Sequence, residues 1–232
     1  MRGRPVLAEE FDRILAAVPK VRPKDTAVWQ RYLTGLWWSG LRLEESTIVS
    51  WDVDAPFMVD FSGKRPRFRI YAEAHKGRYD QYLPMTPDFA TFLLDTPKAE
   101  RTGRLFKLTG LQTGKPITHK RICRTVSDIG KAAGVIVNKA TDKYATAHDL
   151  RRSFGTRWAR RMTPAVLQRL MRHRTIETTM KYYVDLDADD ISEQLWQEHG
   201  AMDLRVGTFV GSDDFQVDLA DDATPQEAQK AL

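Results

Sequence analysis

The chain has 232 residues, of which 42% are hydrophobic, a formal net charge of +5 and one cysteine. This size allows one large domain with a buried core, and the absence of long apolar runs or a signal-peptide pattern predicts a cytoplasmic protein without a membrane span. The lone Cys123 excludes an internal disulfide, and we expect it to be a buried structural thiol.

Charge is distributed unevenly along the chain. From Asp185 onward thirteen acidic residues face two basic ones, for a net charge of −11, whereas residues 1–184 carry +16. A body this basic favours a polyanionic partner such as DNA or RNA, although ordinary solvated charge stays an alternative. The acidic tail could be a solubilising end or could fold back over the basic surface.

Hydrophobic periodicity predicts a mainly helical α+β fold. One helical face runs from Leu7 to Val18, and we expect Pro19 and Pro23 to end this helix before a second one at about 26–39. Three β-type runs, at 57–61, 67–74 and 79–84, predict a small antiparallel three-stranded sheet. Further helices are expected at 88–95, at 119–133 and from 146 to about 198 with a break near Thr163–Pro164, and one more β-type run at 206–210.

Residues 148–183, HDLRRSFGTRWARRMTPAVLQRLMRHRTIETTMKYY, hold two of the five histidines, eight arginines and two adjacent tyrosines. His148 and Arg151 are three residues apart, so on a helix both project from one face, with Arg152 competing for the same place. His173 follows after the helix break, and Tyr182 lies nine residues beyond it.

Arginine, histidine and tyrosine together indicate phosphoryl transfer with a tyrosine nucleophile. Guanidinium groups match the phosphate oxygens that gain charge in the transition state, and cationic neighbours favour the phenolate. Flanking arginines would repel a metal cation from His148 and His173, so we expect no metal site.

Several segments together resemble the tyrosine recombinases, the phage-integrase family. HDLR, LMRH and TTMKY resemble its C-terminal motifs, SGLRLEE its first arginine box, VSWDVD the segment after that box, and HKGRYDQYLP its β-hairpin lysine. The resemblance covers about residues 7–198. It implies a tyrosine-recombinase-like catalytic domain at 1–199, followed by an acidic, partly disordered tail at 200–232.

The resemblance also implies roles for individual residues. Arg42 and Arg151 would clamp the phosphate, with Glu45 supporting Arg42. Lys76 would protonate the departing 5′ oxygen. His173 would donate to the phosphate, and His148 would hold the network or share acid–base work. Tyr182, rather than Tyr183, would form a 3′-phosphotyrosyl link without metal, ATP or any other cofactor. Expected DNA contacts are Arg78, Lys120, Arg152, Arg172 and Arg174.

The implied function is site-specific recombination or integration of double-stranded DNA by a homo-oligomer, expected to be a tetramer. The expected setting is a cytoplasmic, nucleoid-associated enzyme encoded by a bacterium, a phage or another mobile element. Alternatives are a type IB topoisomerase-like enzyme, a non-catalytic DNA-binding relative and an RNA-binding module.

Two features depart from the family pattern. Arg172 stands where the family usually has glycine before the second histidine, which adds charge and bulk near the nucleophile. The family's N-terminal core-binding domain is expected to be absent, because the sequence begins almost where the catalytic domain should. The chain would then be either a fragment or short by nature.

Overall fold

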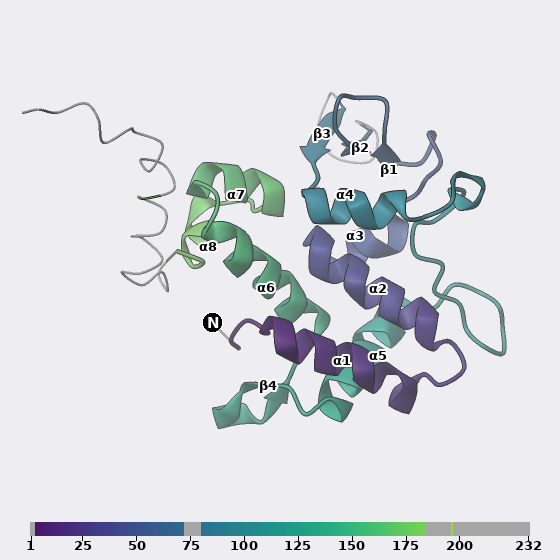
Figure 1. Cartoon of the computed structure of the whole chain (residues 1–232), viewed down its shortest axis with the longest axis vertical. Helices are drawn as coiled ribbons and strands as arrows, with labels where there is room; N and C mark the ends of the chain where they lie inside the picture. The colour runs from purple at the N-terminus through teal and green to yellow at the C-terminus, as the bar shows by residue number, and fades with distance from the viewer. Residues whose placement is uncertain (1–2, 72–79, 184–195, 197–232) are drawn as a thin grey trace, which may run out of the picture. The chain divides into compact units, whose positions relative to one another are not determined.

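The computed structural model describes residues 3–71, 80–183 and 196. The described residues 3–71 and 80–183 belong to one compact unit, and only Trp196 is described in the second unit. In the first unit, α1 (Ala8–Val21) packs against α2 (Thr26–Ser39) and α5 (His119–Ala132), while α2 also packs against α6 (Ala147–Ala159), as Figure 1 shows. Side chains from α1, α2 and α5 form much of the core, which includes Phe11, Ile14, Trp29, Leu33, Leu36, Trp37, Ile122 and Ile129.

The three-stranded sheet is the β part of the fold. Strands β1 (Phe57–Asp60), β2 (Arg67–Ile70) and β3 (Gln81–Pro84) pair antiparallel in the order β1-β2-β3. β1 is buried throughout, whereas β3 is an exposed edge. The ring of Phe68 on β2 lies 5.7 Å from that of Phe89 on α4 (Pro87–Leu94), so the sheet packs on this helix. The predicted sheet and fold class are confirmed.

Smaller elements complete the unit, and several of them were not predicted. These are a six-residue helix, α3 (Leu43–Ile48), and a hairpin of β4 (Ile136–Asn138) and β5 (Lys143–Tyr144). Two 3-10 turns, η2 (Lys98–Glu100) and η3 (Lys139–Thr141), lie in connections. Elements this short carry too few residues for a periodic pattern.

The prediction that Pro19 ends the first helix is wrong. Pro19 lies inside α1, which continues to Val21. A proline removes the backbone hydrogen bond to the carbonyl four residues earlier, here that of Leu15. The Gln30 side chain of α2 donates to the Leu15 carbonyl oxygen at 3.1 Å. Helix packing therefore satisfies the acceptor that the proline leaves open.

The long C-terminal helix expected from residue 146 is broken twice rather than once. α6 ends at Ala159, α7 (Pro164–Met171) follows the predicted break, and a second break precedes α8 (Ile176–Met180). The second break occurs at Arg172, whose φ of 54° is left-handed and ends α7. The rest of this helix, the β-type run at 206–210, the domain boundary at 199 and the acidic tail lie outside the described residues, apart from Trp196.

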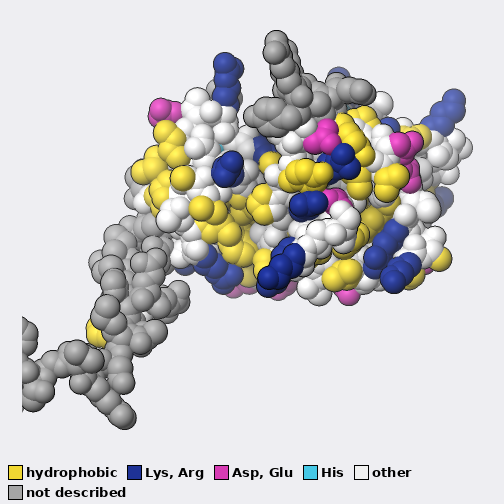
Figure 2. Space-filling view, turned by 90° about the horizontal axis from the view of Figure 1, so that it is seen from above, with side chains coloured by type: hydrophobic (Ala, Val, Ile, Leu, Met, Phe, Trp, Pro, Cys, Tyr) yellow, Lys and Arg dark blue, Asp and Glu magenta, His cyan; other side chains and the backbone are white. Residues whose placement is uncertain are grey.

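The expectation that Cys123 is buried is also wrong, because the thiol lies on an exposed face of α5. The buried face of α5 carries Ile122, Val126 and Ile129, and the position after Ile122 falls outside it. Among the described helices, none is long and apolar enough to cross a membrane. Figure 2 shows basic side chains on one face scattered among apolar, neutral and acidic ones rather than gathered into a band.

Candidate active site

The first arginine stands where α2 gives way to α3. Gly40 ends α2 with a φ of 58°, a left-handed conformation that glycine adopts readily. Arg42 is the N-cap residue of α3, and Glu45 closes a capping box by accepting from the Arg42 backbone amide at 2.7 Å. The same carboxylate pairs with Arg42 Nη1 at 2.7 Å. Local capping chemistry therefore sets the direction of Arg42.

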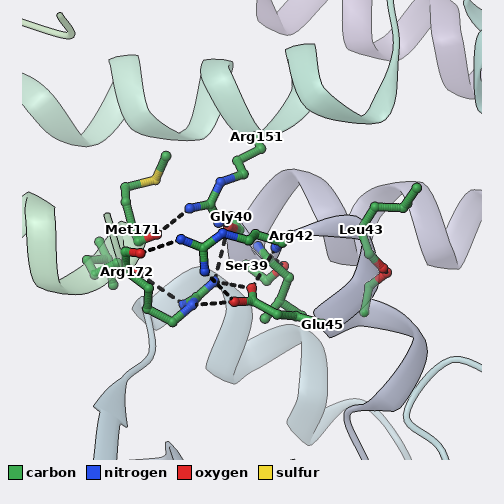
Figure 3. A network of polar contacts seen from close by, with 11 residues as sticks. Ser39, Gly40, Arg42, Leu43, Glu45, Arg151, Met171 and Arg172 are labelled. Carbon is green, nitrogen blue, oxygen red and sulfur yellow. Dashed lines mark hydrogen bonds and ion pairs between the residues drawn. The ribbon is translucent and has the colours of Figure 1, made fainter. Parts of the chain in front are cut away.

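The second arginine is held from α6. Arg151 is 6% exposed, and its two Nη atoms donate to the backbone carbonyls of Gly40 and Met171 (Figure 3). Burial and the nearby charge of Arg172 lower the pKa of Arg151 to about 9, so the guanidinium still carries its charge at neutral pH. Arg151 thus ties the ends of α2 and α7 together.

His148 lies one turn before Arg151 on the same helix. Its neighbour Asp149 is fully buried and accepts from the Thr146 amide at 3.0 Å, which caps α6. Burial and the charge of Arg152 lower the pKa of His148 from 6.5, so the neutral imidazole is favoured. A neutral ring can accept a proton, whereas an imidazolium cannot.

His173 and Tyr182 come from opposite ends of the segment that contains α8. Their rings stack with centroids 5.7 Å apart, and His173 Nδ1 lies 2.9 Å from the hydroxyl of the buried Thr179. Burial, followed by the charges of Arg151 and Arg42, lowers the pKa of His173 to about 4. With Nδ1 engaged by Thr179, Nε2 remains as the second polar atom of a neutral ring.

The two adjacent tyrosines differ in what their hydroxyls contact. The Tyr183 hydroxyl donates to the Met162 carbonyl, and burial raises the pKa of this phenol to about 12. Among the described residues, none hydrogen bonds to the Tyr182 hydroxyl. Burial also raises the pKa of Tyr182, but the charges of Arg151 and Arg152 oppose that rise. Only Tyr182 presents an uncommitted phenol near cationic groups.

These groups line one cavity of about 370 Å³. Its walls come from the start of α3, from α6 and from the segment 173–182. The lining residues are Arg42, His148, Arg151, Arg152, His173, Arg174, Thr178, Lys181 and Tyr182. The fold therefore collects four arginines, two histidines and a tyrosine that the sequence places up to 140 residues apart.

The phage integrase family model matches residues 5–189. The chain belongs to this family. No curated protein sequence matches it.

The fold of this integrase-family domain is that of solved tyrosine recombinases. The XerA recombinase shares 20% identity at a TM-score of 0.52, and the match covers 86% of this chain and 66% of that one. The Tn1549 transposon integrase in complex with circular intermediate DNA shares 18% identity at a TM-score of 0.54, covering 84% and 66%. The XerH site-specific recombinase bound to palindromic difH substrate shares 17% identity at 0.54, covering 85% and 54%. The chain thus spans less than two thirds of XerH and about two thirds of the other two.

The residues expected to contact DNA differ in exposure and in hydrogen-bond partners in this integrase-family domain. Lys120 is exposed in the first turn of α5, and Arg174 is exposed at the cavity. Arg152 is only 6% exposed, and its Nη1 donates to Asp149 at 2.7 Å and to the Gly3 carbonyl at 2.8 Å. Arg152 therefore holds Asp149 through Nη1, and the residue also lines the cavity.

Lys76 and Arg78 lie outside the described residues. Asp80, the first described residue after their segment, lines a second cavity of about 910 Å³ between β3 and α7. His173 and Arg172 line this cavity too. The described chain thus resumes beside the candidate active site.

Several residues of the site were not predicted from the sequence. Thr179 belongs to the TTMKY motif without an expected role, yet it orients His173. Gly155 lies against Tyr182, since a Cβ there would come within 2.5 Å of the Tyr182 ring. A spacing of four residues from Arg151 on α6 could have indicated Gly155, because such residues share a helix face.

Proposed function

We propose that this domain cuts and rejoins double-stranded DNA through a 3′-phosphotyrosyl intermediate on Tyr182, as a site-specific recombinase or integrase. The observation that carries the proposal is the 370 Å³ cavity, in which an unbonded phenol lies among four arginines and two histidines. Such a set offers a nucleophile, charge for the phosphate oxygens and groups that move protons, without a metal.

Arg42 and Arg151 stabilise the charge that develops on the non-bridging oxygens. Each guanidinium has five N–H donors. Arg151 uses two on the Gly40 and Met171 carbonyls, and Arg42 uses two on Glu45 and the Arg172 carbonyl. Three donors remain on each side chain. Preorganised donors in a water-shielded site lower a barrier by about 3 to 4 kcal/mol each.

The two histidines take different roles. His173 Nδ1 lies 2.9 Å from the Thr179 hydroxyl, and the proposed role assigns the tautomer in which Thr179 donates to Nδ1, which leaves Nε2–H to donate to the phosphate. His148, also neutral near pH 7, accepts the phenolic proton or holds the network while Tyr182 attacks.

The covalent steps balance without an energy source. The Tyr182 oxygen attacks phosphorus, the bond to the 5′ oxygen breaks, and Lys76 supplies the proton that this oxygen takes up. A 5′-hydroxyl of the same or a new strand then attacks the phosphotyrosine and expels the tyrosine. Each step exchanges one phosphodiester for another, so ATP is not needed.

DNA is the partner that two of the similar structures hold, the Tn1549 integrase and XerH. The exposed Lys120 and Arg174 are suited to phosphate contacts, as is Arg78. Strand exchange between two duplexes requires four cleavages, so we propose that a homotetramer assembles on DNA.

A covalent-trapping experiment tests the proposal. Wild-type protein, Tyr182→Phe and Tyr183→Phe are incubated in EDTA with duplexes that carry a central 5′-bridging phosphorothiolate flanked by randomised sequence. Cleavage at this linkage releases a 5′-thiol that reseals poorly, so the adduct accumulates. We expect SDS-resistant adducts with the wild type and Tyr183→Phe and none with Tyr182→Phe.

No adduct with the wild type, or an adduct that persists in Tyr182→Phe, would refute the proposal. Duplexes recovered from the adduct identify a reactive site, which is then placed in two plasmids. Exchange between the plasmids supports recombination, whereas relaxation without exchange would assign a topoisomerase-type reaction instead.

A further inference from the structure

Arg172 occupies a backbone position that an arginine side chain does not favour. Its φ of 54° lies in the left-handed region, where glycine commonly ends a helix. Asp142 is the only other non-glycine residue with positive φ in the described part of the chain. An arginine that adopts this conformation calls for side-chain contacts that offset the strain.

Those contacts reach the start of α3. Arg172 Nε donates to Glu45 Oε1 at 3.0 Å and Nη2 to Oε2 at 2.6 Å, which is a two-pronged fork on one carboxylate. Nη1 donates to the Leu170 carbonyl at 3.1 Å. The Arg172 and Glu45 side chains are only 10% and 17% exposed. The fork therefore joins the end of α7 to α3 (Figure 3), and both of its side chains are largely buried.

Both side-chain anchors of Arg42 depend on residue 172. Arg42 Nη1 shares Glu45 Oε1 with Arg172, and Arg42 Nη2 donates to the Arg172 carbonyl. The Arg42 side chain is 44% exposed and lines the cavity, whereas Arg172 is not among the residues that line it. Arg172 thus positions Arg42, which lines the cavity, although Arg172 does not line this cavity.

The fork also changes the charge balance. Were Glu45 paired with Arg42 alone, its negative charge would cancel the positive charge offered to a phosphate. With Arg172 bound to the same carboxylate, the three side chains together carry a net charge of +1. Burial raises the pKa of Glu45, but the charge of Arg172 leads the effects that bring it down to about 2, so the carboxylate stays ionised.

We propose that Arg172 is a positioning residue for Arg42. It holds Glu45 through its side chain and accepts from Arg42 through its own carbonyl. Compared with a glycine at this position, it also adds one positive charge to the phosphate site. This inference rests on the proposed function, in which Arg42 stabilises the scissile phosphate.

The test uses the full chain and the phosphorothiolate duplex recovered with the wild type. Arg172→Asn removes the guanidinium but keeps a residue that tolerates positive φ, and Arg172→Lys keeps the charge without the fork. Arg169→Gln, three residues earlier on exposed α7 surface, removes one charge as a matched control.

We expect the single-turnover rate of adduct formation at saturating DNA to fall at least about tenfold in both Arg172 variants, because misplacing a catalytic group by about 1 Å can cost about a hundredfold. The Kd for DNA should stay within about threefold of the wild type, and Arg169→Gln should react within about twofold. Rates of the Arg172 variants within twofold of the wild type would overturn the proposal. A loss that higher DNA concentration restores would overturn it too, since Arg172 would then be a DNA contact.

A second arm needs no DNA. Thermal unfolding of Arg172→Asn, Glu45→Gln and the double variant forms a cycle, and a shared ion pair predicts a Tm loss in the double variant smaller than the sum of the single losses. Additive losses would show that the fork does not hold Glu45 and would overturn the proposal. If the wild type forms no adduct, the proposed function fails, and this cycle still decides whether Arg172 holds Glu45.

Discussion

Replacing Gly40 by alanine should disturb both the fold and the candidate active site. Gly40 has a φ of 58°, and a Cβ there would lie 2.3 Å from Cδ1 of the fully buried Phe154. Its carbonyl accepts from Arg151. The substitution therefore strains the backbone, pushes on a core ring and moves an anchor of Arg151, for which we propose a catalytic role.

The cost can be worked from these contacts. A left-handed backbone costs an L-residue about 1–2 kcal/mol. Carbon atoms pack at about 3.5 Å or more, so the ring has to move by about 1 Å, and such overpacking costs about 1–3 kcal/mol. The free energy of unfolding should drop by about 2–5 kcal/mol. For a domain of about 200 residues this lowers Tm by about 4–20 °C.

Thermal unfolding followed by circular dichroism measures the loss, with Gly103→Ala as the matched control. Gly103 has a φ of 66°, but a Cβ added there would have no atom within 4 Å, so this variant isolates the backbone cost of about 1–2 kcal/mol. Phe154→Leu should restore part of the Tm of Gly40→Ala. If Gly40→Ala lowers Tm no more than Gly103→Ala does, the Phe154 ring does not oppose the added Cβ.

Three further outcomes are expected. Thr179→Val should slow adduct formation about ten- to hundredfold, as loss of a histidine's orienting partner does at metal sites. Thr179→Ser keeps the hydroxyl and should keep most of the rate. Equal rates in the two variants would contradict the role of the hydroxyl. The pKa of His173 is lowered to about 4 in the folded protein, so the free energy of unfolding should decrease as pH falls from 6.5 to about 4. Denaturant titrations of His173→Gln should lack this part of the pH dependence, and parallel curves for variant and wild type would count against it. Asp149→Ala should lower the free energy of unfolding by about 3–5 kcal/mol, because it removes the carboxylate that pairs with the 6% exposed Arg152. A loss under about 1 kcal/mol in a denaturant titration would show that the Asp149–Arg152 pair is dispensable.

The exposed cysteine offers a simple check on the description of α5. Cys123 should react with a thiol reagent in the folded protein, because its side chain lies outside the buried face of the helix. Protection until unfolding would contradict this placement.

The sequence by itself determined the helices with strong periodicity, the three strands and the fold class. α2 begins and ends where apolar spacing and Gly40 predict, and β1 to β3 form the expected antiparallel sheet. Patterns of this kind are local, since they depend on which residues share a face within one element. The motifs also pointed to Arg42, His148, Arg151, His173 and Tyr182, which the structure brings to one cavity.

Only the tertiary structure decided the features that depend on partners distant in the sequence. Pro19 stays helical because Gln30, fifteen residues away from the acceptor, donates to the Leu15 carbonyl. Arg172 binds Glu45 across 127 residues, and Arg152 holds the Gly3 carbonyl across 149. A single sequence records the residue types but not these contacts, because their energies arise only when separate elements pack together. The same packing left Cys123 exposed and made Arg172 a partner of Glu45.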